Sequence, residues 1–339
     1  MPKSRTTASA AKLSSSLNPW GSSSARIISF ISHKGGVGKT TSTVNLGAAF
    51  ALSKHKTLLI GLDPQCGLSL TLGFDKTSLN GGLKDVLSTG LPLNKVIHTT
   101  PLENLSLLSP NAWSMAQEDQ YKTSVGKYGV LGELLEQVRQ DFDTILIDCP
   151  PGFGPETRAA LTVSDSFIIP VQAEELCHNT VNRMLNFIRD FKPVAKKGLL
   201  MEGLFLTMTD ARIRMSREVT KALSKEFKGD VFKTAIPRAA QLAEMASQGK
   251  PTVIYDRRGR GSIAYFNLMD EIIKRHSKRP AQEVQPQPQV STQAPVKSSA
   301  KVEKPSPQTK QGNGSTTGPV SRIWNYITRK GNGRASTGM

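Results

Sequence analysis

Short apolar runs alternate with helical patterns along most of the chain, from residue 26 to about residue 275. Apolar runs of about four to eight residues predict strands, and longer segments with apolar residues at helical spacing predict amphipathic helices. The predicted strands read RIISFI, TLLIGL, LSLLS, TILID, SFIIPV, GLFLTM, FKTAI and TVIYD. The predicted helices cover residues 39–53, 130–140, 155–163, 179–191, 215–227, 239–247 and 262–274.

Apolar strands that alternate with helices are typical of a parallel sheet whose two faces are both covered. We therefore expect residues 26–276 to form one α/β domain, built on a mostly parallel, twisted sheet with helices on both faces. No apolar run approaches the roughly 18 residues that a membrane span requires.

The two ends of the chain lack this pattern. Residues 1–25 are rich in Ser, Thr and Ala and predict a disordered basic tail, although an acid-free leader also fits an organelle transit peptide. Residues 277–319 are rich in Pro, Gln and Ser and predict a disordered linker. Residues 320–339 form a basic tail in which Ile323, Trp324 and Ile327 would share one side of a short helix. That helix would suit a partner or a membrane surface, or have no function.

Charge is concentrated at these ends. The formal net charge is +17, of which residues 1–25 carry +3 and residues 277–339 carry +8. Basic tails favour a polyanionic partner such as nucleic acid or an anionic membrane, with simple solubility as the alternative. The three cysteines are too widely spaced for a disulfide framework or a zinc site, which favours a reducing cytoplasm.

A glycine-rich turn, ISHKGGVGKTT at residues 31–41, lies between a predicted strand and a predicted helix. Glycines let backbone N–H groups crowd around phosphate oxygens, and the helix N-terminus adds partial positive charge. Lys39 can then reach the β- and γ-phosphates, and the Thr40 hydroxyl can bind Mg²⁺. The expected nucleotide contacts are Lys34, Gly35, Gly36, Val37, Gly38, Lys39, Thr40 and Thr41.

Two further predicted strands end in carboxylates. Asp148 ends the strand TILID, where we expect it to hold the magnesium shell through water. Gly152 follows with an N–H that could meet a γ-phosphate and report its loss. Asp63 follows TLLIGL and is a candidate to orient the attacking water, with a purely structural turn as the alternative.

At these residues a family resemblance becomes visible. KGGVGKTT resembles the deviant Walker A motif of the ParA/MinD ATPases, and LDPQ, IDCPP and the segments beginning at Thr207 and Ile236 resemble later motifs of the ParA (Soj-type) branch. The resemblance covers most of residues 26–275. It implies an ATPase that uses ATP and Mg²⁺, with catalytic roles for Lys34, Lys39 and Asp63, and that is weak unless a partner stimulates it.

The resemblance also implies a cycle. Lys34 would reach across a homodimer to phosphates in the other subunit, where an extra cation offsets the repulsion between two triphosphates. The dimer would bind nucleoid DNA nonspecifically in the cytoplasm until a ParB-like or other cargo adaptor stimulates hydrolysis. Such cycles partition plasmids or chromosomes, or position protein assemblies such as carboxysomes.

The chain departs from the family pattern in two places. Gly61 stands where an acid is usual before Asp63, which weakens the expected support of magnesium. Cys66 replaces a more usual residue nearby, and we interpret it, like Cys149, as a small packing residue. For the adenine ring, similarity indicates Met208 and Pro237, although core packing would also explain Met208.

Basic residues recur at intervals of three and four in the predicted helix RMSREVTKALSKEFK, which places them in one stripe. A dimer would double this stripe into a surface that follows a phosphate backbone. A merely solvated helix face is the alternative. The candidate DNA-binding residues are Arg214, Arg217, Lys221, Lys225, Arg257, Arg258 and Arg260.

Two other functions fit the sequence less well. A MinD-like membrane-associated positioning ATPase would use residues 320–330 as an amphipathic anchor. An electron-transfer ATPase related to nitrogenase reductase would need two cysteines per subunit for a bridging cluster, and Cys66, Cys149 and Cys177 are far apart in the sequence.

Overall fold

The computed structural model describes residues 18–278, except 175–176, 192–193, 197 and 211. The chain divides into two units, residues 1–282 and 283–339, and all described residues belong to the first. The predictions for the tails at residues 1–17 and 279–339 therefore lie outside the described residues, including the linker and the amphipathic segment.

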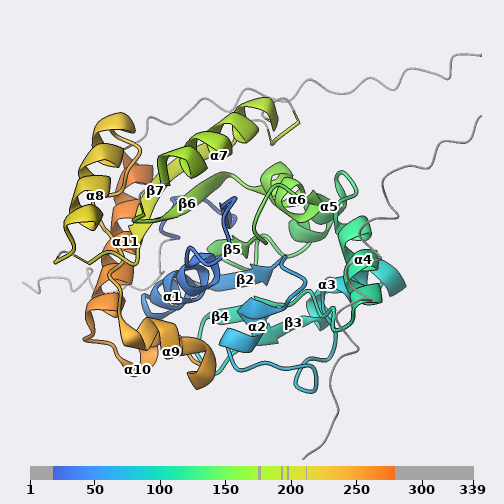
Figure 1. Ribbon diagram of the computed structural model, residues 1–339. Helices are drawn as coiled ribbons and strands as arrows, with labels where there is room; N and C mark the ends of the chain where they lie inside the picture. Colours follow the sequence, from blue (N-terminus) through green and yellow to red (C-terminus); the bar gives the residue numbers. More distant parts are fainter. Residues whose placement is uncertain (1–17, 175–176, 192–193, 197, 211, 279–339) are drawn as a thin grey trace, which may run out of the picture. The chain divides into compact units, whose positions relative to one another are not determined.

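Seven strands form one sheet in the order β3-β4-β2-β5-β1-β6-β7. Neighbouring strands pair in parallel, except that β3 runs antiparallel to β4 at the edge. The predicted mostly parallel α/β sheet is thus confirmed (Figure 1). The strands are β1 Arg26–Phe30, β2 Thr57–Gly61, β3 Ile97–Thr99, β4 Leu105–Leu108, β5 Thr144–Asp148, β6 Ser166–Gln172 and β7 Leu200–Thr207.

Helices cover both faces of this sheet. They are α1 Lys39–Leu52, α2 Gly67–Thr71, α3 Leu83–Thr89, α4 Met115–Val125, α5 Val130–Glu136, α6 Pro155–Val163, α7 Cys177–Phe191, α8 Arg214–Glu226, α9 Ala240–Gln248, α10 Thr252–Tyr255 and α11 Arg260–Ser277, with a 3₁₀ turn at Leu93–Lys95.

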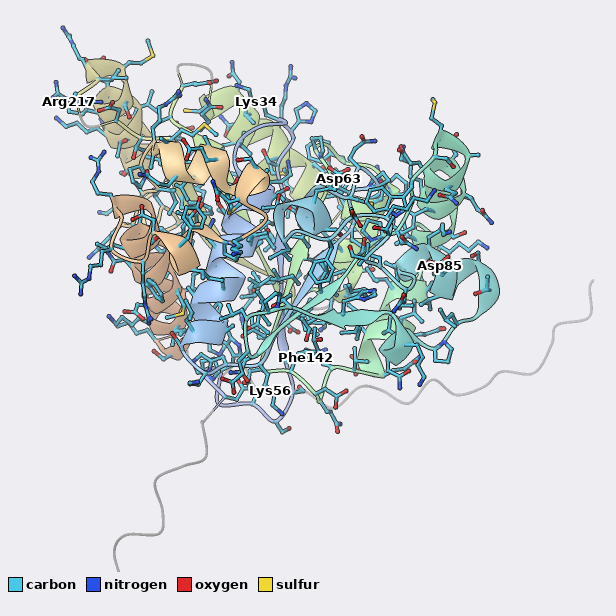
Figure 2. The ribbon with its side chains drawn as sticks, turned by 90° about the horizontal axis from the view of Figure 1, so that it is seen from below. Lys34, Lys56, Asp63, Asp85, Phe142 and Arg217 are labelled. Atoms are coloured by element: carbon cyan, nitrogen blue, oxygen red, sulfur yellow. The ribbon has the colours of Figure 1, made fainter. Side chains whose placement is uncertain are left out.

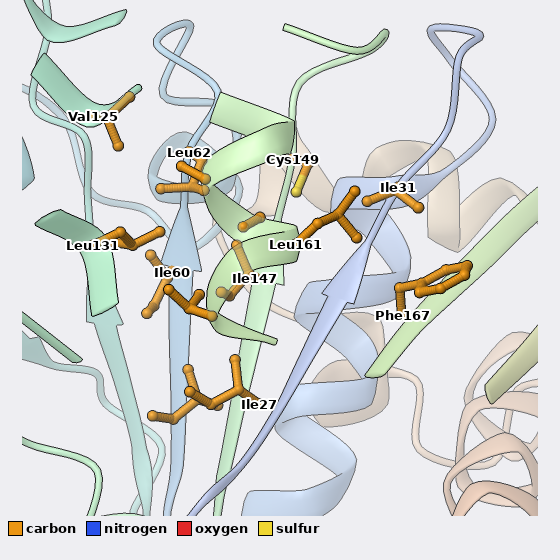
Figure 3. Close-up of a cluster of buried hydrophobic side chains, with 14 of the residues drawn as sticks. Ile27, Ile31, Ile60, Leu62, Val125, Leu131, Ile147, Cys149, Leu161 and Phe167 are labelled. Carbon is orange, nitrogen blue, oxygen red and sulfur yellow. The ribbon is translucent and has the colours of Figure 1, made fainter. Parts of the chain in front are cut away.

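Each central strand contributes side chains to two separate apolar cores. Ile145 and Ile147 of β5 pack into a core shared with α3 to α8, whereas Leu146 packs into a core shared with α1, α2 and α9 to α11. This follows from the two-residue period of a strand, because successive side chains point to opposite faces. Figure 3 shows part of the first core, where Ile60, Ile147 and Leu161 lie together.

Two predicted strands are not strands. The segment TVIYD contains helix α10, which begins directly after Pro251 and leaves Ile254 and Tyr255 exposed. A short apolar run cannot be assigned to strand or helix from periodicity alone, so the strand prediction for this segment was wrong. The segment FKTAI forms no strand, and only isolated β-bridges flank it, at Val231 and Pro237. The sequence reasoning also missed the short elements α2, α3 and β3, and the longer helix α4.

The folded domain starts earlier than the predicted boundary at residue 26. Trp20 is buried, and its Nε1 donates to the Thr144 hydroxyl at 3.0 Å. Its ring packs against Phe50 of α1, and the Arg26 guanidinium lies over the ring at 5.5 Å. This buried aromatic residue therefore attaches the described part of the Ser-rich segment, residues 18–25, to the domain. No helix among the described residues has the length and apolar character that crossing a bilayer requires.

Candidate nucleotide-binding site

The carboxyl ends of the three central strands bring the predicted site together. In the sheet register Asp148 at the end of β5 lies beside Phe30 of β1 and Gly61 of β2. The glycine-rich loop follows β1, and Asp63 follows β2, so both lie at the same edge of the sheet. Figure 2 shows Lys34 and Asp63 at this edge, with Lys56 and Phe142 at the opposite one.

The loop between β1 and α1 has the backbone that its glycines permit. Gly36 and Gly38 have φ angles of +73° and +88°, in the left-handed region that favours glycine. Gly38 caps α1 without any side-chain hydrogen bond, which leaves the N–H groups of the first turn directed at the site. The Thr207 hydroxyl at the end of β7 donates to the Val37 carbonyl at 2.9 Å and fixes the loop from the side.

Lys39 and Asp148 form the buried base of the site. Lys39 is 7% exposed, and burial lowers its pKa against the opposing charges of Asp148, Cys149 and Asp63. Burial raises the pKa of Asp148 to about 7, against the Thr40 hydrogen bond and the charge of Lys39. The Lys39 ammonium donates to the Lys34 carbonyl at 3.5 Å, so it already lies under the loop that would hold phosphates.

The oxygens at this base fit a magnesium ion. The Thr40 hydroxyl donates to Oδ2 of Asp148 at 2.6 Å, while the buried Oδ1 has no hydrogen-bond partner among the described residues. A hydroxyl beside a carboxylate with a spare oxygen is the kind of donor set that Mg²⁺ and its waters use. Bound Mg²⁺ would offset the negative charge of the nucleotide phosphates.

Gly152 differs from the prediction of an available N–H. This N–H donates to the Ser32 carbonyl at 3.0 Å, and the residue has a φ of +95°. A contact with a γ-phosphate would therefore have to replace an existing hydrogen bond between the two loops. The following residue, Phe153, stacks on His33 with ring centroids 5.0 Å apart.

Asp63 lies in a tight turn after β2. Its Oδ1 accepts a hydrogen bond from the Gln65 N–H at 3.0 Å, and its carbonyl accepts one from the Cys66 N–H, also at 3.0 Å. These bonds support the structural interpretation of Asp63. Its charge also acts on Lys39, which places the carboxylate near the phosphate loop. A catalytic role for Asp63 is therefore compatible with this position.

Apolar neighbours occupy the space beside Gly61, where the resembled family has an acid. A β-carbon at this position would lie 3.3 Å from Cδ of Pro110 and 3.5 Å from Cβ of Leu68. The first distance is tighter than ordinary van der Waals contact. An aspartate here would need its neighbours to move, so the packing around β2 explains why glycine is suitable.

The two predicted adenine contacts line one cavity. Met208 and Pro237 surround a space of about 260 Å³ together with Gly38 and Thr41, which belong to the loop and first turn of α1. Met208 has a φ of +52°, an uncommon conformation for a residue other than glycine. The sequence reasoning missed other residues that line this cavity, among them Thr207, Arg238, Leu242 and Tyr265.

A second cavity, of about 390 Å³, opens beside the glycine-rich loop. Lys34 lies at it and forms an ion pair with Glu174, which follows β6. Val181 and Met184 of α7 line its apolar side. Glu174 was missed in the sequence, although an acid just after a buried strand, at the edge where the other strands end, was an available signal.

The predicted basic stripe is exposed. Val219 and Leu223 of α8 are buried, while Arg214, Arg217, Lys221 and Lys225 on the same helix are exposed. Figure 2 shows Arg217 toward the same end of the molecule as Lys34. The other candidate DNA-binding residues, Arg257, Arg258 and Arg260, are exposed as well.

The start of α11 lies close to the start of α8. Hydrogen bonds from Arg212, and more weakly the charge of Arg260, hold the pKa of Asp210 well below its usual range. Arg260 begins α11 and Asp210 precedes α8, so this interaction brings the starts of the two helices near each other.

Comparisons with known proteins give this geometry a context. A family model described as an AAA domain matches residues 25–201. The sporulation initiation inhibitor protein Soj of Bacillus subtilis (strain 168) is 37% identical over 73% of this chain and 98% of that protein. The chromosome partitioning protein ParA of Myxococcus xanthus is 33% identical over 74% of this chain and 88% of that protein. The structure of the septum site-determining protein MinD of Pyrococcus horikoshii, complexed with Mg-ADP, has a TM-score of 0.61 at 28% identity and covers 73% of this chain and 96% of that one.

Proposed function

The chain belongs to the family of ParA/Soj partitioning ATPases, and from this premise we propose that it is an ATP-dependent switch that positions a cargo on DNA. Its enzymatic activity is that of the family, hydrolysis of ATP to ADP and phosphate. We propose that ATP and Mg²⁺ close a homodimer, that the dimer binds DNA without base readout, and that a ParB-like or other cargo adaptor stimulates hydrolysis. This cycle would take place in the cytoplasm, on the nucleoid.

The observation that carries the proposal is the placement of two kinds of cation at the same end of the molecule. Lys34 emerges from the phosphate loop half-exposed, where a second subunit can meet it. The exposed stripe on α8 lies toward the same end (Figure 2). Closure of a dimer at this edge would bring two stripes into one assembly, which strengthens binding to a polyanion.

Separate sets of residues would hold the phosphates, the magnesium ion and the adenine ring of the nucleotide. The loop backbone, with Lys39 below it, suits the phosphates, and Thr40 with Asp148 suits magnesium. The cavity between Met208 and Pro237 suits the adenine ring, because it opens beside the first turn of α1. Asp63 is the proposed water-orienting residue.

A MinD-like membrane-associated ATPase is the second candidate. A MinD structure shares the fold at 28% identity, and residues 320–330 combine apolar with basic side chains. That segment lies outside the described residues. Vesicle binding that disappears when residues 320–330 are deleted, without DNA binding, would favour this candidate.

DNA binding by the full chain tests the proposed function. Fluorescence anisotropy of a random duplex with Mg²⁺ and ATP should show binding at least about tenfold tighter than with Mg²⁺ and ADP, and the affinity should fall as salt rises. Lys34→Ala should remove this ATP dependence. Lys54→Ala, which removes an exposed lysine in the turn after α1, is the matched control and should behave as the wild type.

Mutations on α8 test the DNA surface separately. Arg217→Ala and Lys221→Ala should each weaken binding to all duplex sequences alike. Each should also reduce the slope of log affinity against log salt concentration by about 1, the value for one lost phosphate contact. Equal DNA affinity with ATP and ADP would contradict the switch while leaving the ATPase activity intact.

A further inference from the structure

Lys34 is held by an acidic residue of its own chain. The lysine lies in the loop before α1, and Glu174 lies just after β6, far away in the sequence. Their ammonium and carboxylate form an ion pair in which both side chains remain about half-exposed, at 47% and 46%. The contact therefore joins two loops at the edge of the sheet where the nucleotide site lies.

The surroundings of this pair offer few other charges. Of the described residues that line the adjacent cavity, Glu174 is the one with a negative charge. Much of the remaining lining is apolar, including Val37, Val181 and Met184. Among the residues that the structure describes, Glu174 is thus the acidic partner of the lysine.

The same ammonium cannot serve two anions in different places. Lysine carries a compact charge on one flexible stem, so its ammonium moves as a single group. If Lys34 reaches the phosphates of a second subunit, it has to leave Glu174. The cost of breaking the ion pair is then subtracted from the free energy of pairing.

We propose that Glu174 is a positioning residue that retains Lys34 within its own subunit and thereby sets the protein concentration at which the ATP-bound chain forms a dimer. This inference rests on the proposed function, since it assumes that Lys34 crosses between subunits. Triphosphate on the facing subunit competes with Glu174 for the lysine. Diphosphate, with less negative charge, competes less well.

The expected size of the effect follows from the exposure of the pair. Ion pairs at solvent-accessible positions typically change an equilibrium constant by a factor of about 1.4 to 5. A symmetric dimer releases two such pairs. Removing the charge of Glu174 should therefore lower the dimer dissociation constant by about 2- to 25-fold.

The test is analytical ultracentrifugation of the full chain with Mg²⁺ and a nonhydrolysable ATP analogue. Glu174→Gln should pair at lower protein concentration than the wild type, and the difference should shrink at high salt, which screens the broken pair. Glu103→Gln is the matched control, because it removes the acid of the exposed ion pair with Lys54 and should leave pairing unchanged. Thermal unfolding of both variants should match the wild type, which excludes a general loss of structure.

The outcomes separate this inference from the proposed function. If the wild type remains a single chain with the analogue, the proposed dimer itself fails. If the wild type pairs and Glu174→Gln pairs equally or less tightly, the positioning role is wrong while the switch stands. If the double variant Lys34→Ala with Glu174→Gln forms the dimer while Lys34→Ala alone does not, the charge at residue 174 acts without the lysine. That result also overturns the inference.

Discussion

Individual polar groups at the phosphate loop are engaged with one another in the chain alone. Thr40 donates to Asp148, Gly152 donates to the Ser32 carbonyl, and Lys34 pairs with Glu174. A buried polar group is costly to leave without a partner, so the bond between Thr40 and Asp148 stabilises the site, whereas the half-exposed pair of Lys34 and Glu174 contributes less. Nucleotide binding at this site is then an exchange of hydrogen bonds, and its net free energy is smaller than a count of new contacts would suggest.

Asp63→Ala should separate hydrolysis from pairing. If its carboxylate orients the attacking water, its loss should slow ATP hydrolysis by about a hundredfold or more, because positioned general bases contribute on that order. The dimer formed with ATP should persist, since the phosphate loop is unchanged. Phosphate release and sedimentation measure the two properties, with Glu103→Ala as an exposed acidic control. Normal hydrolysis by Asp63→Ala would leave this residue with its turn role alone.

At the scale of elements, an aromatic stack connects both sides of the nucleotide site to helix α7. The rings of His33 and Phe153 are 5.0 Å apart, those of Phe153 and Phe187 are 4.1 Å apart, and Phe187 stacks in turn on Phe191. Arg158 of α6 lies over the last two rings. The loop after β1, the loop after β5 and helix α7 are therefore packed as one unit through these rings.

Phe153→Ala should loosen this unit. Each stacked aromatic pair contributes about 0.5–1.5 kcal/mol, and the substitution removes two pairs, so the free energy of unfolding should fall by about 1–3 kcal/mol. Phe153→Tyr keeps the ring and should remain close to the wild type. Urea denaturation without nucleotide measures both variants. Equal losses for alanine and tyrosine would show that stacking is not the stabilising contact.

At the scale of the whole molecule, the Asp165 carboxylate joins several segments at the edge opposite the nucleotide site. Asp165 accepts hydrogen bonds from the Ile27 N–H at 2.8 Å, from Arg139 at 2.8 and 3.0 Å and from Lys196 at 2.6 Å. Burial tends to raise its pKa, but Lys196, the Ile27 N–H and Arg139 together hold it below the ordinary value. This residue ties β1 to the segments before β5 and β7.

Asp165→Asn should make stability less dependent on pH. A carboxyl whose pKa is lower in the folded than in the unfolded state stabilises the fold above its unfolded pKa of 3.8. That stabilisation disappears as the pH falls through the folded pKa. We expect the variant to lose about 1–3 kcal/mol at pH 7, less than for a fully buried pair because Asp165 is 21% exposed, and the difference to shrink as the pH falls below 3.8. Urea denaturation at several pH values measures it, and a constant difference would contradict the ionic role.

The fold could be predicted from the sequence more completely than the contacts between side chains. The order of the main strands and helices followed from apolar periodicity, because both faces of the sheet are buried. The acid at the end of β5 and the glycines of the phosphate loop were found because they are fixed by local sequence. The partners of Gly152 and Lys34 were not, since Ser32 and Glu174 reach them through tertiary packing. Trp20 was missed for the same reason, because its position depends on contacts with Thr144 and Phe50. Helix α10 was missed because periodicity does not separate a short helix from a short strand.

The burial of every cysteine has a practical consequence. Cys66 and Cys149 are 1% exposed and Cys177 is 5% exposed. Maleimide dyes require an accessible thiolate, so the native protein should label slowly while folded. A single cysteine introduced in place of Glu103, whose side chain is 79% exposed, would then carry a fluorophore selectively. Energy transfer between two labelled copies would follow subunit association in real time without removing any natural thiol.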